Sequence, residues 1–74
     1  MQIDGLIEID GARLRSLRER QALTSKELGS ISGLSRFTIE RIEREQRPAK
    51  AKLQTVRKLA DALDVDLGVL ITTR

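Results

Sequence analysis

The chain has 74 residues and a formal net charge of +3, and it contains neither cysteine nor histidine. This length is enough for one small domain that buries about 60% of its unfolded surface. The missing residue types exclude disulfides, thiolate chemistry, the usual zinc sites and catalytic imidazoles, so we expect no enzyme, cofactor or metal site. No apolar run is long enough to cross a bilayer or to form a signal-peptide core, so we expect a cytoplasmic protein without a membrane partner.

Charge is distributed unevenly along the chain. The first ten residues carry three acids and no base, whereas residues 36–58 carry eight basic and three acidic side chains. The second segment therefore has a net charge of +5. Such a basic block in a folded module favours a polyanionic partner, although it could also be an ordinary solvated face.

The amino-terminal residues differ in character from the rest. Residues 6–9, Leu-Ile-Glu-Ile, have the composition of a strand but are very few. They could pair with residues 69–72, within one chain or between two. We therefore treat residues 1–10 as an N-terminal arm or short strand and residues 11–74 as one domain.

Two helices are predicted next. The first begins near Gly11, and Asp10 is a good N-cap for it. The second begins after Thr24, whose hydroxyl can form a capping box with Glu27 three residues later. Gly33 is expected to end the second helix in a left-handed conformation.

The second helix has a short apolar stripe, Leu28 and Ile31, which we expect to pack into the core. Gly29 lies between them, and glycine in a helix interior costs about 1 kcal/mol relative to alanine. A small residue at this position is explained if another helix crosses closely there.

A third helix is predicted after Ser35, its N-cap, with Ile39 and Ile42 pointing into the core. Phe37 is the only aromatic residue of the chain. At about 100° per residue it lies roughly 160° from Ile39 and 140° from Ile42, so it faces outward. The other long side chains on this outward side are those of Arg36, Arg41 and Arg44.

The remaining residues predict two more helices. Pro48 prevents the third helix from continuing. A fourth helix is expected over residues 52–63, where apolar residues recur at three- and four-residue spacing. Asp66 can cap a last short helix that carries Leu67, Leu70 and Ile71. The fold class that follows is all-α, with five helices and a possible short N-terminal strand.

A series of ordered motifs extends over residues 11–71. They are Leu14-x-x-Leu17-Arg18, Thr24-x-x-Glu27-Leu28, Gly33-Leu34-Ser35, Thr38-Ile39-x-Arg41-Ile42-Glu43, Pro48 and Leu59-Ala60-x-Ala62-Leu63-x-Val65. In this order they resemble the helix-turn-helix domain of the phage lambda repressor and Cro class, also called the XRE family. The resemblance implies a compact five-helix lambda-repressor-like bundle. It also implies a sequence-specific regulator of transcription that binds double-stranded DNA, most often a repressor at a near-palindromic operator.

The resemblance also implies roles for individual residues. The helix over residues 35–44 corresponds to the recognition helix, which enters the major groove. Base-reading positions of the family fall on Arg36, Phe37 and Arg41. Phosphate-binding positions fall at the start of the second helix and just after the third, which makes the candidates Thr24, Ser25, Lys26, Arg44, Gln46 and Arg47. Arg18 and Glu43 match an ion pair that ties the first helix to the end of the recognition helix.

Each candidate base-reading residue has a chemical rationale and an alternative. Arg36 could bind guanine O6 and N7, or lie at the surface or on a phosphate. Phe37 could pack on thymine methyl groups, or belong to the core or to a dimer contact. Glu40 could orient Arg36, accept from cytosine N4, or form an ordinary helix ion pair. Arg41 could read a guanine or clamp a phosphate.

Three residues depart from the family pattern. Ser25 stands where the family usually has glutamine, so a contact to both phosphate and base is reduced to the backbone alone. Glu45 stands where the family usually has glycine, which implies either a strained conformation or a different turn, with an acid near the phosphates. Phe37 replaces a polar base reader.

The expected partners are double-stranded DNA and a second copy of the chain, because this class binds half-sites about 34 Å apart as dimers. The apolar residues that could form the dimer contact are Leu67, Val69, Leu70 and Ile71 at the carboxyl end or Leu6, Ile7 and Ile9 in the amino strand. An alternative function is an antitoxin or accessory protein-binding module that also binds its own promoter. No small-molecule effector is indicated.

Overall fold

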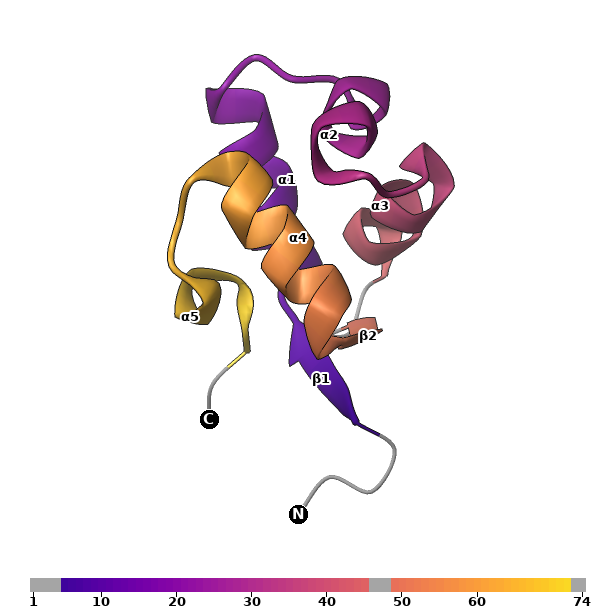
Figure 1. Cartoon of the computed structure of the whole chain (residues 1–74), viewed down its shortest axis with the longest axis vertical. Coiled ribbons are helices and arrows are strands. Elements are labelled where there is room, and N and C mark those ends of the chain that lie inside the picture. The colour runs from indigo at the N-terminus through magenta and orange to yellow at the C-terminus, as the bar shows by residue number, and fades with distance from the viewer. Residues whose placement is uncertain (1–4, 46–48, 73–74) are drawn as a thin grey trace.

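Five helices and a two-stranded sheet make up the described part of the chain, residues 5–45 and 49–72 of the computed structural model. In chain order they are β1 (Leu6–Ile9), α1 (Gly11–Arg20), α2 (Ser25–Ser32), α3 (Arg36–Arg44), β2 (Ala49–Lys52), α4 (Leu53–Leu63) and α5 (Leu67–Leu70). Helices α2 and α3 lie together on one side of α4, and the sheet lies near the start of α4 (Figure 1). The five helices were predicted, but the fold is not purely all-α because of the sheet.

Strand β2 was not predicted from the sequence. It pairs antiparallel with β1, from Leu6 opposite Lys52 to Ile9 opposite Ala49. Its sequence, Ala-Lys-Ala-Lys, alternates between buried alanines and exposed lysines. Both residue types are depleted in strands, so the alternation alone was too weak and too short a signal.

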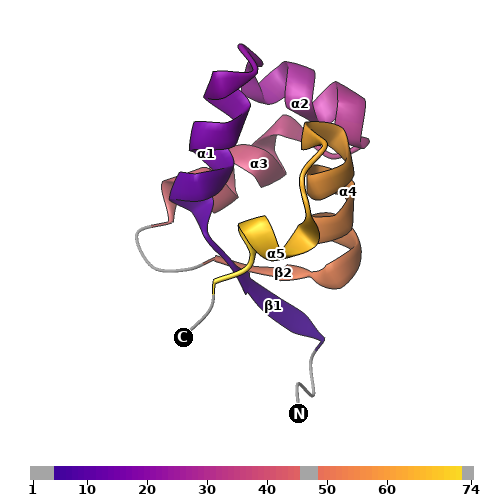
Figure 2. The same ribbon diagram turned by 90° about the vertical axis from the view of Figure 1, so that its left-hand side faces the viewer.

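Strand β1 also contacts the carboxyl end on its other edge. Ile9 and Ile71 form an antiparallel bridge. The backbone N–H of Thr72 donates to the carbonyl of Glu8 at 3.0 Å, and the N–H of Asp10 donates to that of Leu70 at 2.8 Å. The expected pairing of residues 6–9 with residues 69–72 is therefore present within one chain, as a bridge beside the sheet. Figure 2 shows α5 next to the sheet, at the end of the molecule opposite α2.

The helix starts follow the sequence signals, with one exception. The Asp10 side chain accepts a backbone N–H from the first turn of α1 at 3.1 Å. The capping box is complete, because Thr24 Oγ1 accepts the Glu27 N–H at 3.0 Å and Glu27 Oε1 accepts the Thr24 N–H at 2.8 Å. Ser35 Oγ accepts an N–H from the first turn of α3 at 3.1 Å. Asp66 precedes α5 but its side chain makes no capping bond, so that expectation was wrong.

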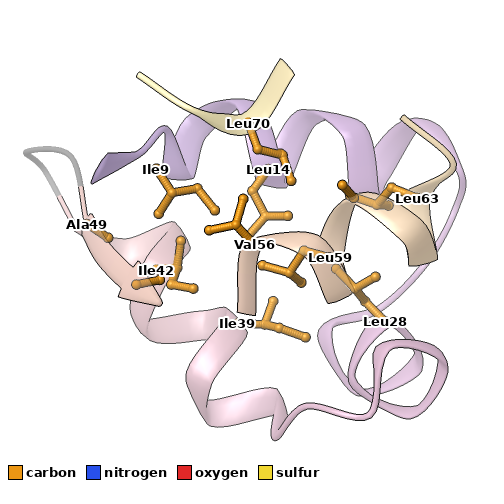
Figure 3. Close-up of a cluster of buried hydrophobic side chains, with 12 residues drawn as sticks. Ile9, Leu14, Leu28, Ile39, Ile42, Ala49, Val56, Leu59, Leu63 and Leu70 are labelled. Atoms are coloured by element: carbon orange, nitrogen blue, oxygen red, sulfur yellow. The ribbon is translucent and has the colours of Figure 1, made fainter. Parts of the chain in front are cut away.

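The core receives side chains from both strands and all five helices (Figure 3). The largest fully buried ones are Ile9, Leu14, Leu28, Ile39, Ile42, Val56, Leu59, Leu63 and Leu70. Full burial of such a side chain stabilises the fold by about 1.5–3 kcal/mol. Because Ile9 is among them, β1 belongs to the same core as the helices.

The predicted stripe of α2 is only half right. Leu28 is fully buried, but Ile31 is 58% exposed. The buried side of α2 includes Gly29, since a Cβ there would lie 2.7 Å from the Leu34 carbonyl oxygen and 3.3 Å from the Arg36 nitrogen. The close neighbour is thus the turn into α3 rather than a crossing helix. With the buried side centred between residues 28 and 29, Ile31 lies about 110° away and faces solvent.

Candidate nucleic-acid interface

The outer face of α3 carries the candidate base-reading residues. Phe37 is 65% exposed, whereas Ile39 and Ile42 on the opposite side are fully buried. The alternative that Phe37 belongs to the core is therefore wrong. The arginines of α3 that are also exposed are Arg36, Arg41 and Arg44. A large apolar ring and three cations thus share the solvent side of one helix.

Arg36 and Phe37 are in direct contact. The guanidinium carbon of Arg36 lies 4.9 Å from the centroid of the Phe37 ring. This is within the distance of about 6 Å at which a cation is attracted to a ring face. This contact was not predicted from the sequence, although two adjacent exposed residues of these types at a helix start are a recognisable signal for it.

Glu40 does not hold Arg36. Within residues 5–45 and 49–72, no ion pair joins the two side chains. Glu40 is half-buried and lines a shallow depression of about 210 Å³ together with Arg15, Glu43 and Arg44. Pockets that enclose drug-sized ligands have about 300–1,000 Å³, so the depression is small for such a ligand.

A part-buried ion pair joins α3 to α1. Arg18 Nε and Nη2 donate to the two carboxylate oxygens of Glu43 at 2.8 and 2.9 Å, and Arg18 Nη1 donates to the Leu23 carbonyl at 2.7 Å. The side chains of Arg18 and Glu43 are only 12% and 8% exposed. The hydrogen bond with Glu43 raises the pKa of Arg18 above its ordinary value, so the guanidinium stays charged at any pH at which the fold would be studied. The ion pair expected between Arg18 and Glu43 is present.

The start of α2 holds the next candidates. Thr24 and Lys26 are exposed and Ser25 is half-buried. The Thr24 hydroxyl is engaged in the capping box, and the first-turn N–H groups of a helix point outward along its axis. Helices α2 and α3 pack against each other, so this helix end belongs to the same half of the molecule as the α3 face.

After α3 the described residues continue as far as Glu45 and resume at Ala49. Glu45, which stands where the family has glycine, adopts φ −64° and ψ 130°. This is ordinary extended backbone, so Glu45 is not strained. Two candidate phosphate-binding residues, Gln46 and Arg47, and the helix-stopping Pro48 lie outside the described residues.

Two of the candidate dimer residues are inaccessible. Ile9 and Leu70 are fully buried in the core of the single chain. The other candidates keep partial exposure, namely Leu6, Ile7, Leu67, Val69 and Ile71.

Two other kinds of site are absent from residues 5–45 and 49–72. There, no helix has the length and apolar character needed to cross a membrane. The same ranges contain no group of three or more acidic, histidine or cysteine residues that could hold a metal ion.

Comparison with known families matches residues 11–71 to the helix-turn-helix domain. The chain belongs to this family. One relative of the chain is the HTH-type transcriptional repressor RghR of Bacillus subtilis (strain 168), which is 42% identical to it over 59 residues. The match covers 80% of this chain but only 43% of RghR, so the chain spans less than half of that relative.

Two solved helix-turn-helix structures have a similar fold. The restriction-modification controller protein C.AhdI from Aeromonas hydrophila is 39% identical, with a TM-score of 0.71 over 80% of this chain and 86% of that one. SinR, the master regulator for biofilm formation, was solved in complex with DNA and is 25% identical, with a TM-score of 0.67 over 78% and 90% of the two chains. The resemblance inferred from the motifs is thus confirmed at the level of the family.

Proposed function

We propose that this chain is a sequence-specific regulator of transcription that binds double-stranded DNA, acting as a repressor with α3 in the major groove. The observation that carries the proposal is the exposed face of α3, where the side chains of Phe37 and three arginines lie in solvent. The names of RghR, C.AhdI and SinR, all regulators, support a regulator over an antitoxin. Such a protein acts where DNA is, in the cytoplasm of a bacterium or an infected host, and needs no catalysis.

The proposed base-reading residues are Arg36, Phe37 and Arg41. Arginine binds guanine O6 and N7 through two N–H groups, and an aromatic ring packs on the thymine methyl group. Since Glu40 lies beside Arg15 and not on Arg36, its proposed part is limited to a cytosine N4 contact.

The proposed phosphate contacts give affinity and register with little sequence information. At the start of α2, the helix dipole and outward N–H groups attract a phosphate beside Thr24, Ser25 and Lys26. Arg44, exposed at the end of α3, would bind a second phosphate, with Gln46 and Arg47 as further candidates.

The protein would act as a homodimer on a near-palindrome, because one recognition helix reads one half-site. Leu67 and Val69 of α5 are partly exposed and offer an apolar contact near the carboxyl end. Sedimentation that finds only a monomer at micromolar concentration, on DNA as well as off it, would rule out this part of the proposal.

The proposal is tested by selecting bound sequences from random DNA and then titrating the selected site at several salt concentrations. Affinity should fall steeply with salt, because phosphate neutralisation releases counterions.

Arg36→Ala should weaken binding to the selected site by about 1–3 kcal/mol and leave non-specific binding nearly intact. Arg44→Ala should weaken both kinds of binding and reduce the salt slope by about 1. Equal affinity for all sequences, or affinity independent of salt, would contradict the proposal.

A further inference from the structure

The contact between Arg36 and Phe37 joins two proposed base readers into one structural unit. These residues are the first two of α3, and the amino end of a recognition helix is the part that meets base edges. The guanidinium carbon lies 4.9 Å from the ring centroid. Both side chains are exposed, and Phe37 is 65% exposed even with the guanidinium on one face.

Stacking leaves the hydrogen-bonding capacity of Arg36 available. A guanidinium packs on a ring through its flat face, whereas its five N–H donors lie in its plane. Among the described residues, no carboxylate or carbonyl accepts a hydrogen bond from the Arg36 side chain. The ring therefore restricts the orientation of the guanidinium without using any of the donors that would bind guanine.

The distance between the two groups lies between one and two base-pair steps and is nearer to one. Successive base pairs are about 3.4 Å apart along the duplex, so two steps are about 6.8 Å. A separation of 4.9 Å between cation and ring centre is closer to one step than to two. If the guanidinium lies in the plane of a guanine and the 4.9 Å separation runs along the duplex axis, the ring is nearest to the level of the adjacent base pair.

We propose that Arg36 and Phe37 read a single dinucleotide step, in which a guanine bound by Arg36 lies next to a pyrimidine whose C5-methyl group contacts the Phe37 ring. This inference rests on the proposed function and names part of its DNA target. The pyrimidine is thymine or 5-methylcytosine, because both present the same methyl group at C5 in the major groove. Recognition of that position thus depends on the methyl group and not on the base pair that carries it.

The test uses the half-site selected from random DNA, with the bases next to the Arg36-dependent guanine replaced one at a time. Replacing the contacted thymine by deoxyuridine removes only the methyl group and should lower the affinity about fourfold. In Phe37→Ala the same replacement should change the affinity less than about 1.5-fold, because no ring is left to cover the methyl group. Arg41→Ala is the matched control, and there the full loss should persist, since the Phe37 ring and its contact with Arg36 are kept.

A second arm changes the base pair and keeps the methyl group. A cytosine in place of the contacted thymine should weaken binding, and 5-methylcytosine should restore about fourfold of the loss in the wild type but not in Phe37→Ala. Circular dichroism should show unchanged folding for Phe37→Ala and Arg41→Ala, since both side chains are exposed.

The possible failures are distinct. If no sequence is preferred over random DNA, the proposed function fails and the inference fails with it. If a half-site is bound specifically but the uracil and methylcytosine effects are equal in the wild type and Phe37→Ala, or absent from both, the inference alone is overturned.

Discussion

A single side chain, Arg18, connects three segments of the structure. Its guanidinium bonds both carboxylate oxygens of Glu43 near the end of α3 and the Leu23 carbonyl in the turn before α2. The pair is much less exposed than the pair of Arg15 with Glu19, whose side chains are 63% and 55% exposed. Removing one partner of a buried pair leaves an uncompensated charge, whereas an exposed pair contributes little.

Glu43→Ala should therefore lower the free energy of unfolding by about 3–5 kcal/mol. Glu19→Ala is the matched control and should change it by no more than about 0.5 kcal/mol. Urea denaturation followed by circular dichroism measures the free energy of unfolding of both variants. Equal losses would mean that the pair of Arg18 with Glu43 contributes no more to stability than the exposed pair. Replacing both residues, Arg18→Met with Glu43→Leu, should recover much of the lost stability.

At the scale of the elements, α1 and α3 approach each other closely at Gly11. A Cβ on this residue would lie 3.0 Å from the Ile42 carbonyl carbon and 3.2 Å from the Glu43 Cα, and closer still to the Ile42 carbonyl oxygen. These are backbone atoms, which cannot move aside as a flexible side chain would. The start of α1 therefore sets the position of the second half of α3.

Gly11→Ala should destabilise the protein by about 1–3 kcal/mol, the usual cost of overpacking. It should also weaken specific DNA binding, because α3 must shift to make room. Gly68→Ala is the control, since nothing lies within 4 Å of its Cβ position. That variant should be neutral or more stable by about 0.5–1 kcal/mol. Thermal melts compare the stability of the two variants with that of the wild type. A stabilised Gly11→Ala would show that the close approach of α1 and α3 is not rigid.

At the scale of the whole molecule, β1 closes the core. Ile9 is fully buried and is held between β2 on one side and Ile71 on the other. The amino-terminal strand is thereby joined to segments some 40 and 60 residues further along the chain. Of the helix-turn-helix itself, α2 lies away from the sheet, whereas α3 contacts β2 (Figure 1).

Ile9→Ala should cost about 2–5 kcal/mol, because it deletes buried methyl groups and leaves a cavity. Ile31→Ala makes the same change on a side chain that is 58% exposed and should stay within about 0.5 kcal/mol of the wild type. Chemical denaturation of both variants compares a strand residue with a helix residue of identical chemistry. A small effect at Ile9 would mean that the strand is dispensable for the fold.

Local signals in the sequence determined the helices and the outward direction of the recognition face. The caps at Asp10, Thr24 and Ser35 act within one helical turn, so they were readable without knowledge of the rest of the fold. The exposure of Phe37 followed from the 3.6-residue period and from the two isoleucines opposite it. Asp66 shows the limit of such signals, because a capping residue type at the right position made no bond.

Only the tertiary structure decided features that depend on a distant partner. Strand β2 forms because its backbone pairs with β1. Four residues are too few for a periodic pattern to predict such a pairing. Ile31 is exposed because the close approach at Gly29 rotates the buried side of α2 away from it. The stack of Arg36 on Phe37 required the actual side-chain conformations at the start of α3. Periodicity and caps report on one turn of chain, whereas burial, strand pairing and side-chain stacking depend on the three-dimensional neighbours.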